Sequence, residues 1–212
     1  MGEDLPAAER LLRRALQLDE RCADALGLMA FLAMSSKPPR FEDARRLALG
    51  AIEASALPEG EWLNLLGIAT AELDQPEQAV AALQEAMAAD PFDHRSPDTI
   101  AKILIERKRV REALDFLRTY SRFMTQLHQP IHPAIGALMA DAHARQGEFE
   151  QAIPILEELV RLYPEELALG LQLAETCAAG GDLGRARAAV AAVLAKEPRH
   201  PRALELREKL GP

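Results

Sequence analysis

Aromatic side chains are scarce in this sequence. They make up 4% of its 212 residues, although hydrophobic residues as a whole make up 49%. Alanine and leucine therefore supply most of the apolar surface, and both favour helices, whereas strands favour β-branched and aromatic residues. The composition predicts an all-α protein, and the chain is long enough to bury a substantial core.

Cysteine is rare as well. Cys22 and Cys177 are the only two, and they lie far apart in the sequence. Without a C-x-x-C spacing, neither a zinc site nor a redox motif is expected. We expect free thiols, which are typical of a reducing compartment.

Long apolar runs are missing too. No stretch of about 18 apolar residues occurs, so no membrane insertion is expected. The first residues, MGEDLPAAERLL, lack the basic start and apolar core of a secretory signal. The sequence predicts a cytoplasmic protein, and it fits a fragment of a longer chain equally well.

The sequence also lacks the marks of nucleic-acid binding and of catalysis. With 25 basic and 33 acidic residues its formal charge is −8, which repels a phosphate backbone. It contains no glycine-rich phosphate loop, no G-x-S-x-G and no H-E-x-x-H. His128 and His132 have a metal-like spacing, but Pro130 between them disfavours a helix. We predict that the protein is not an enzyme and that it binds no cofactor, metal or nucleic acid.

What the sequence does contain is a repeat. Residues 63–91, LNLLGIATAELDQPEQAVAALQEAMAADP, match the template W-x₂-L-G-x₂-Y…A-x₃-F…P at most of its positions. Leu66 and Gly67 match the L-G pair, and Pro91 matches the terminal proline. Other copies follow at a spacing of 34 residues: Gly67 and Ala101, Ala79 and Ala113, Gly147 and Gly181, Ala152 and Ala186, Pro164 and Pro198.

These positions have a physical logic. Small residues suit the points where two antiparallel helices cross, because larger ones would hold the backbones apart. Proline stops the second helix of each unit and sets the following turn. Ser96 and Pro97 read as the N-cap and first position of a helix. The pattern resembles the tetratricopeptide repeat over nearly the whole chain.

The resemblance implies an all-α, right-handed α-α superhelix of antiparallel helix pairs, with about 12 helices. Residues 1–22 would form an N-terminal half repeat, and 201–212 a polar C-terminal capping helix. Residues 23–200 would form the five full repeats: 23–57, 60–93, 94–127, 133–166 and 167–200. Two stretches break the period: residues 35–41 add two residues and 124–133 add five, and surface loops tolerate such additions cheaply.

The resemblance also implies a binding surface. In this family the first helix of each pair lines a concave groove that holds a peptide or helix of another protein. The groove positions predicted in this sequence are Leu28, Phe31, Met34, Asn64, Leu65, Ile68, Arg95, Asp98, Lys102, Asp141, Arg145 and Gln172. The N-terminal part is apolar around Phe31, Met34 and Ile68. The alternative is that these apolar residues belong to the core between helices.

A basic run marks the turn within the third repeat. Arg107, Lys108, Arg109 and Arg111 lie where other copies have glycine. They could steer an acidic partner, although a charge run at a turn is usually only solvated.

The predicted function is a protein–protein interaction scaffold or adaptor. Two alternatives remain open. One is a self-assembling structural module, a homo-oligomer joined through Leu11, Leu12 and Leu16 of the half repeat. The other is the targeting domain of a longer enzyme.

Overall fold

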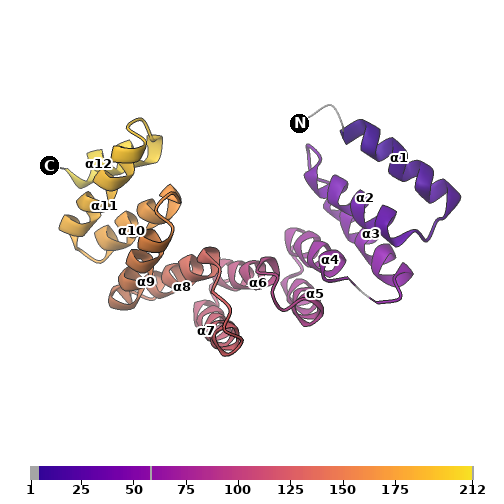
Figure 1. Ribbon diagram of the computed structural model, residues 1–212, viewed down its shortest axis with the longest axis horizontal. Coiled ribbons are helices and arrows are strands. Elements are labelled where there is room, and N and C mark those ends of the chain that lie inside the picture. The colour runs from indigo at the N-terminus through magenta and orange to yellow at the C-terminus, as the bar shows by residue number, and fades with distance from the viewer. Residues whose placement is uncertain (1–4, 58, 212) are drawn as a thin grey trace. The chain divides into compact units, whose positions relative to one another are not determined.

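The computed structural model describes residues 5–57 and 59–211, so the first four residues of the predicted half repeat and the last residue of the predicted cap lie outside the described part. The described residues form twelve α-helices and no strand (Figure 1), which confirms the all-α fold class. The helices are α1 (Leu5–Leu18), α2 (Ala23–Ser35), α3 (Phe41–Ala54), α4 (Gly60–Glu72), α5 (Pro76–Ala89), α6 (Arg95–Glu106), α7 (Val110–Gln126), α8 (Pro133–Arg145), α9 (Phe149–Leu162), α10 (Leu167–Ala179), α11 (Leu183–Lys196) and α12 (Pro201–Leu210).

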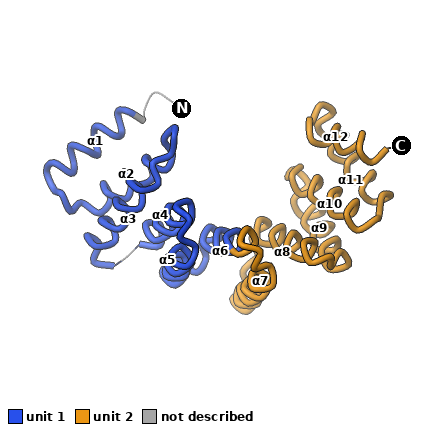
Figure 2. Tube along the Cα trace, turned by 180° about the vertical axis from the view of Figure 1, so that it is seen from behind, with its two compact units in different colours: residues 1–103 blue, residues 104–212 orange. Residues whose placement is uncertain are grey.

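The chain divides into two compact units, residues 1–103 and 104–212 (Figure 2). In the first unit α2 packs on α3 and α4 packs on α5, while α3 and α4 join the two pairs. In the second unit α8 packs on α9 and α10 on α11, with α12 against both α10 and α11. This division differs from the predicted repeat boundaries, which stay a prediction.

Buried alanines and leucines form the cores of both units. In the first unit Ala30, Ala48, Ala51, Trp62 and Leu65 cluster together. In the second, one cluster surrounds Leu156 and another surrounds Val190. The small residues at the predicted crossing positions are buried, among them Ala44, Ala79, Ala113, Ala152 and Ala186.

Two glycines show why these positions must be small. A Cβ atom on Gly67 would lie 2.5 Å from Cγ of Leu83, and one on Gly27 would lie 2.4 Å from the ring of Trp62. Both distances are far shorter than any van der Waals contact. The neighbouring helices therefore approach closely only because Gly27 and Gly67 carry no Cβ atom.

The turns inside the helix pairs share one backbone conformation. Asp74, Lys108, Gly147 and Gly181 all have a positive φ, from 62° to 85°. Each lies in the middle of a three-residue turn between the two helices of a pair. Asp74 and Lys108 are 34 residues apart, as are Gly147 and Gly181. The left-handed turn therefore recurs with the period of the sequence, although only two of the four turns use glycine, the residue that adopts it without strain.

The structure changes three details of the sequence prediction. Ser96 is not an N-cap, because α6 already begins at Arg95 and the Ser96 side chain is buried. The 35–41 insertion lengthens the turn between α2 and α3 to residues 36–40, closed by hydrogen bonds from the Ser36 hydroxyl to the Ala33 and Pro38 carbonyls. The 124–133 insertion is partly helix: α7 has 17 residues, whereas α5 and α9 have 14, and it continues to Gln126.

Candidate protein-binding surfaces

Helix α2 exposes two large apolar side chains. Leu28 is 47% exposed and Phe31 is 52% exposed. They lie three residues apart, so they share one side of the helix. The other side of α2 buries Ala25, Ala30 and Ala33 in the core of the first unit. An almost wholly apolar helix is usually buried all round, so this exposed face marks a candidate contact surface.

Met34 and Ile68 were predicted beside these residues and are half-buried. Met34 packs against two core clusters, the one around Trp62 and the one formed by Ala33, Ala44 and Ala69. For Met34 the alternative interpretation as a core residue therefore holds in part, because only part of its side chain is open to a partner.

Asn64 and Leu65 are buried, and the prediction that they contact a peptide is wrong for this conformation. Leu65 is only 8% exposed and belongs to the core cluster with Trp62. The amide Nδ2 of Asn64 donates a hydrogen bond of 2.8 Å to Oγ of Ser96. Asn64 thereby joins α4 to α6, and with only 2% of the residue exposed its amide is out of reach of a peptide at the surface.

The charged residues predicted on α6 are exposed or partly exposed, and they pair with their neighbours. Lys102 Nζ lies 2.6 Å from Asp98 Oδ2. Arg95 Nε lies 3.0 Å from Asp93 Oδ2, and its Nη1 lies 3.8 Å from Glu61. Burial works to raise the pKa of Asp93, but hydrogen bonds from the Arg95 side chain and backbone outweigh it and hold that pKa below its usual value.

The predicted groove residues of the second unit are also engaged. Arg145 Nε donates to Asp141 Oδ2 over 2.7 Å, one turn away on α8. Gln172 on α10 donates to the backbone carbonyl of Ala137 on α8 over 2.8 Å. Gln172 therefore helps to hold α10 against α8. The paired charges of Arg145 and Asp141 contribute little binding energy when they are exposed.

The basic turn lies between α6 and α7. Lys108 occupies its left-handed position, and Arg109 donates two hydrogen bonds to the carboxylate of Glu112. An open cavity of about 300 Å³ is lined here by Lys108, Arg109, Val110, Arg111, Glu112 and Gln146. The turn therefore offers a hollowed basic surface in the second unit, at the place the sequence indicated.

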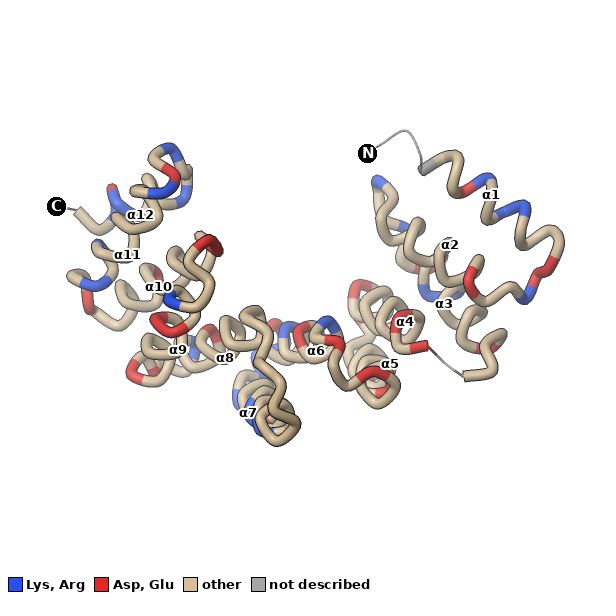
Figure 3. The backbone as a smooth tube through the Cα atoms, viewed as in Figure 1, with Lys and Arg blue, Asp and Glu red and all other residues tan. Residues whose placement is uncertain are grey.

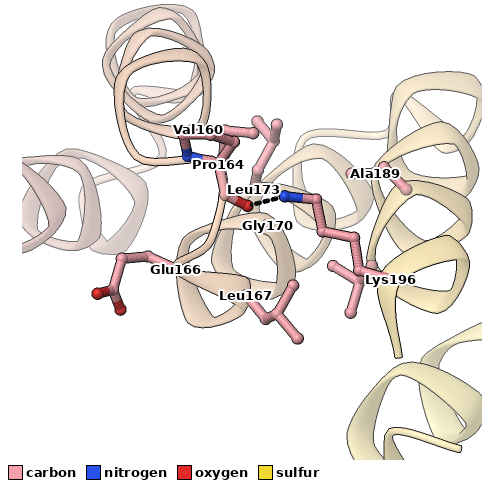
Figure 4. Close-up of a pocket in the computed structure, with 10 residues that line it drawn as sticks. Val160, Pro164, Glu166, Leu167, Gly170, Leu173, Ala189 and Lys196 are labelled. Carbon is pink, nitrogen blue, oxygen red and sulfur yellow. Dashed lines mark hydrogen bonds between the residues drawn. The ribbon is translucent and has the colours of Figure 1, made fainter. Parts of the chain in front are cut away.

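A second cavity was not predicted from the sequence. It lies between the end of α9 and helices α10 and α11, has a volume of about 100 Å³, and is walled mainly by apolar side chains such as Leu167 and Val193. Figure 4 shows Lys196 reaching across it to donate to the carbonyl of Pro164. Ligand pockets usually measure about 300–1,000 Å³, so this space is too small for a typical ligand.

The described residues bring together no metal-binding group. They contain no cluster of three or more His, Cys, Asp or Glu side chains that could hold a metal ion. Cys177 is buried, and burial raises the pKa of its thiol, which disfavours the nucleophilic thiolate. His143 is buried, and its Nδ1 lies 2.6 Å from Oε2 of Glu148. Within this same described part, no helix combines the length and apolar character that a membrane crossing needs.

Comparison with known proteins gives a family match for part of the chain and a fold match for nearly all of it. A tetratricopeptide repeat model matches residues 143–210, and the folds of several solved proteins match nearly the whole chain. A chain of the APC/C hetero-tetramer Cut9–Hcn1 has a TM-score of 0.71 at 15% identity, over 97% of this chain. The family model places residues 143–210 in the tetratricopeptide-repeat family. The solved structures show that the rest of the chain shares the fold.

Two more solved structures share the tetratricopeptide-repeat fold. PilF of Pseudomonas aeruginosa has a TM-score of 0.68 at 18% identity, covering 89% of this protein and 82% of that one. YrrB, described as a TPR protein with an unusual peptide-binding site, has a TM-score of 0.60 at 15% identity, covering 92% and 96%. The protein spans 39% of the matched chain in the Cut9–Hcn1 structure. No curated protein matches its sequence.

Tetratricopeptide repeats are in general non-catalytic scaffolds for protein–protein interaction. The fold alone does not choose a partner, because the same fold serves many functions. The exposed residues of this protein must therefore carry any more specific argument.

Proposed function

We propose that this protein is a non-catalytic scaffold or adaptor that binds a peptide or amphipathic helix of another protein through the apolar face of α2. The exposure of Leu28 and Phe31 on one side of that helix carries the proposal. Met34 and Ile68, half-buried, would extend the same contact. The peptide-binding site named for YrrB belongs to that protein, and it supports a peptide as the class of ligand here.

The energy of such a contact follows from the exposed area. Full burial of a leucine or phenylalanine contributes roughly 1.5–3 kcal/mol. Since about half of each side chain is already buried, covering the rest of Leu28 and Phe31 contributes about 2 kcal/mol together. That equals roughly a thirty-fold gain in affinity, so these residues act as anchors within a larger contact.

The test is capture of a partner from a lysate of the source cells. We expect a protein to be retained by the native chain and lost with Leu28→Glu/Phe31→Glu, because a charge on each anchor opposes burial. The matched control is Leu162→Glu/Leu183→Glu, which changes two exposed leucines of the second unit. Equal capture by all three proteins, with helicity intact by circular dichroism, would show that the α2 face is not the binding surface.

Self-assembly is a second candidate, and helix α1 favours it. Leu11 is 72% exposed and Leu18 is 76% exposed. They are seven residues apart and so lie on one side of α1. Leu12 and Leu16 of the predicted contact are half-buried, and no α1 side chain that the structure describes is fully buried. Two apolar faces of this kind could cover each other in a homo-oligomer.

Light scattering over a concentration series tests self-assembly. If α1 joins two copies, the native mass should rise with concentration, and Leu11→Glu/Leu18→Glu should stay monomeric. A native chain that keeps the monomer mass throughout would remove this candidate and leave the scaffold proposal untouched.

We further propose a cytoplasmic location, since both cysteines are free thiols.

A further inference from the structure

One face of α7 carries a row of arginines that the sequence analysis did not connect to the basic turn. Arg111, Arg118 and Arg122 follow one another at intervals of seven and four residues. At 3.6 residues per turn these intervals place them within about 40° of one another around the helix. The row is about 16 Å long, at a rise of 1.5 Å per residue. We call it the arginine face.

The side chains of the arginine face are open to a partner. All three are exposed. Arg118 has one acidic neighbour, Asp115, at 3.8 Å on the same helix. No ion pair joins Arg111 or Arg122 to another residue of the described chain. Many other surface arginines of this protein, such as Arg13, Arg145 and Arg161, are paired at under 3 Å within their own helices.

The arginine face continues the basic turn into a single positive region. Residues 107–122 contain six basic and two acidic residues, a formal charge of +4 in a chain whose total is −8. Figure 3 shows blue segments of the backbone tube along α7, which mark its lysine and arginine residues. Such segregation matters because a local positive surface attracts an acidic ligand even when the whole protein is acidic.

We propose that the arginine face binds an acidic helical segment of a partner protein. A helix with acidic residues on one side, at intervals of seven and four, presents a carboxylate to each arginine along the length of the row. A nucleic acid or an anionic membrane fits less well, since either extends past the 16 Å row and meets the acidic remainder of the chain. Arginine also suits the role, because its planar group bonds a carboxylate with two donors.

The arginine face is separate from the apolar face of α2. The two lie on different helices, one in each compact unit. An acidic segment bound to α7 would add a second contact to whatever α2 holds. Failure at one surface therefore leaves the other intact, and each can be tested alone.

The probe is a fluorescein-labelled helical peptide of about 20 residues, long enough for a stable alanine-rich helix. Its glutamates occupy one side at the intervals of the arginine face, and a second peptide of the same composition spreads them around the helix. Fluorescence anisotropy at low salt measures binding to the native chain. We expect the one-sided peptide to bind more tightly and to weaken as salt is added.

Two variants of equal charge complete the experiment. Arg111→Gln/Arg118→Gln/Arg122→Gln should weaken binding on the order of ten-fold, since each exposed pair contributes about two-fold. Arg187→Gln/Arg199→Gln/Arg207→Gln, which removes the same charge from exposed positions elsewhere in the second unit, should change it less than about two-fold. No binding at low salt, equal loss in both variants, or equal affinity for the two peptides would overturn the proposal. Tighter binding of a duplex DNA than of the one-sided peptide would overturn it as well.

Discussion

Replacing Gly27 with alanine should destabilise the first compact unit by about 2 kcal/mol. The added Cβ atom would lie 2.4–2.5 Å from three ring atoms of Trp62. Overpacking of a core usually costs about 1–3 kcal/mol, and a rigid indole ring cannot swing aside as a flexible chain end can. At these distances we expect an overpacking cost at or above the upper end of that range. The better helix propensity of alanine offsets only about 1 kcal/mol of this cost.

Trp62 itself provides the measurement. It is the only tryptophan of the chain, so its fluorescence during urea unfolding reports the region around Gly27. The matched control is Gly184→Ala on α11, where the nearest atom to the new Cβ is 3.6 Å away. That change should stabilise the second unit by up to about 1 kcal/mol, as followed by circular dichroism. A neutral or stabilising Gly27→Ala would contradict the close packing of α2 on α4.

The pair Gly67 and Leu83 should show strong energetic coupling. Leu83 is fully buried, so Leu83→Ala should cost about 2–5 kcal/mol. Gly67→Ala should also destabilise, by about 1–3 kcal/mol, because its Cβ would lie 2.5 Å from Leu83 Cγ and 2.7 Å from Cδ2. In the double variant the alanine at position 67 occupies space that Leu83 has vacated.

The double variant should therefore be clearly more stable than the sum of the single changes predicts, with a coupling of about 1 kcal/mol or more. A full double-mutant cycle by urea unfolding measures it. The carbonyl of Ala79 lies 3.2 Å from the new Cβ and remains in place, so complete rescue is not expected. Simple additivity would show that Leu83 does not pack on Gly67.

The sequence predicted the fold well because the repeat constrains it at many positions at once. Small residues recur at the crossings, and the 34-residue spacing carries over to the left-handed turns at Asp74 and Lys108. The start of α6 was harder to predict. Ser96 and Pro97 look like a cap in sequence, but the Ser96 hydroxyl accepts a hydrogen bond from Asn64, which lies 32 residues away.

The exposure of the residues predicted to bind a partner was also harder to predict. Leu28 and Leu65 occupy the same position in their repeats, two residues before Ala30 and Gly67. Leu28 is 47% exposed, whereas Leu65 is 8% exposed. Their exposure depends on which side chains the neighbouring helices supply, and the repeat period does not contain that information. The arginine face of α7 was not predicted either, although the intervals of seven and four residues between its members are present in the sequence.

Site-specific photo-crosslinking at position 31 tests the central claim most directly. A photo-reactive phenylalanine analogue there keeps an aromatic ring on the α2 face, and the same analogue at position 162 serves as the control on a surface equally exposed but not proposed to bind. We predict a covalent adduct with a partner protein from position 31, abolished by Leu28→Glu, and none from position 162. An adduct from position 162 alone, or one from position 31 that Leu28→Glu leaves unchanged, would contradict binding at the apolar face of α2.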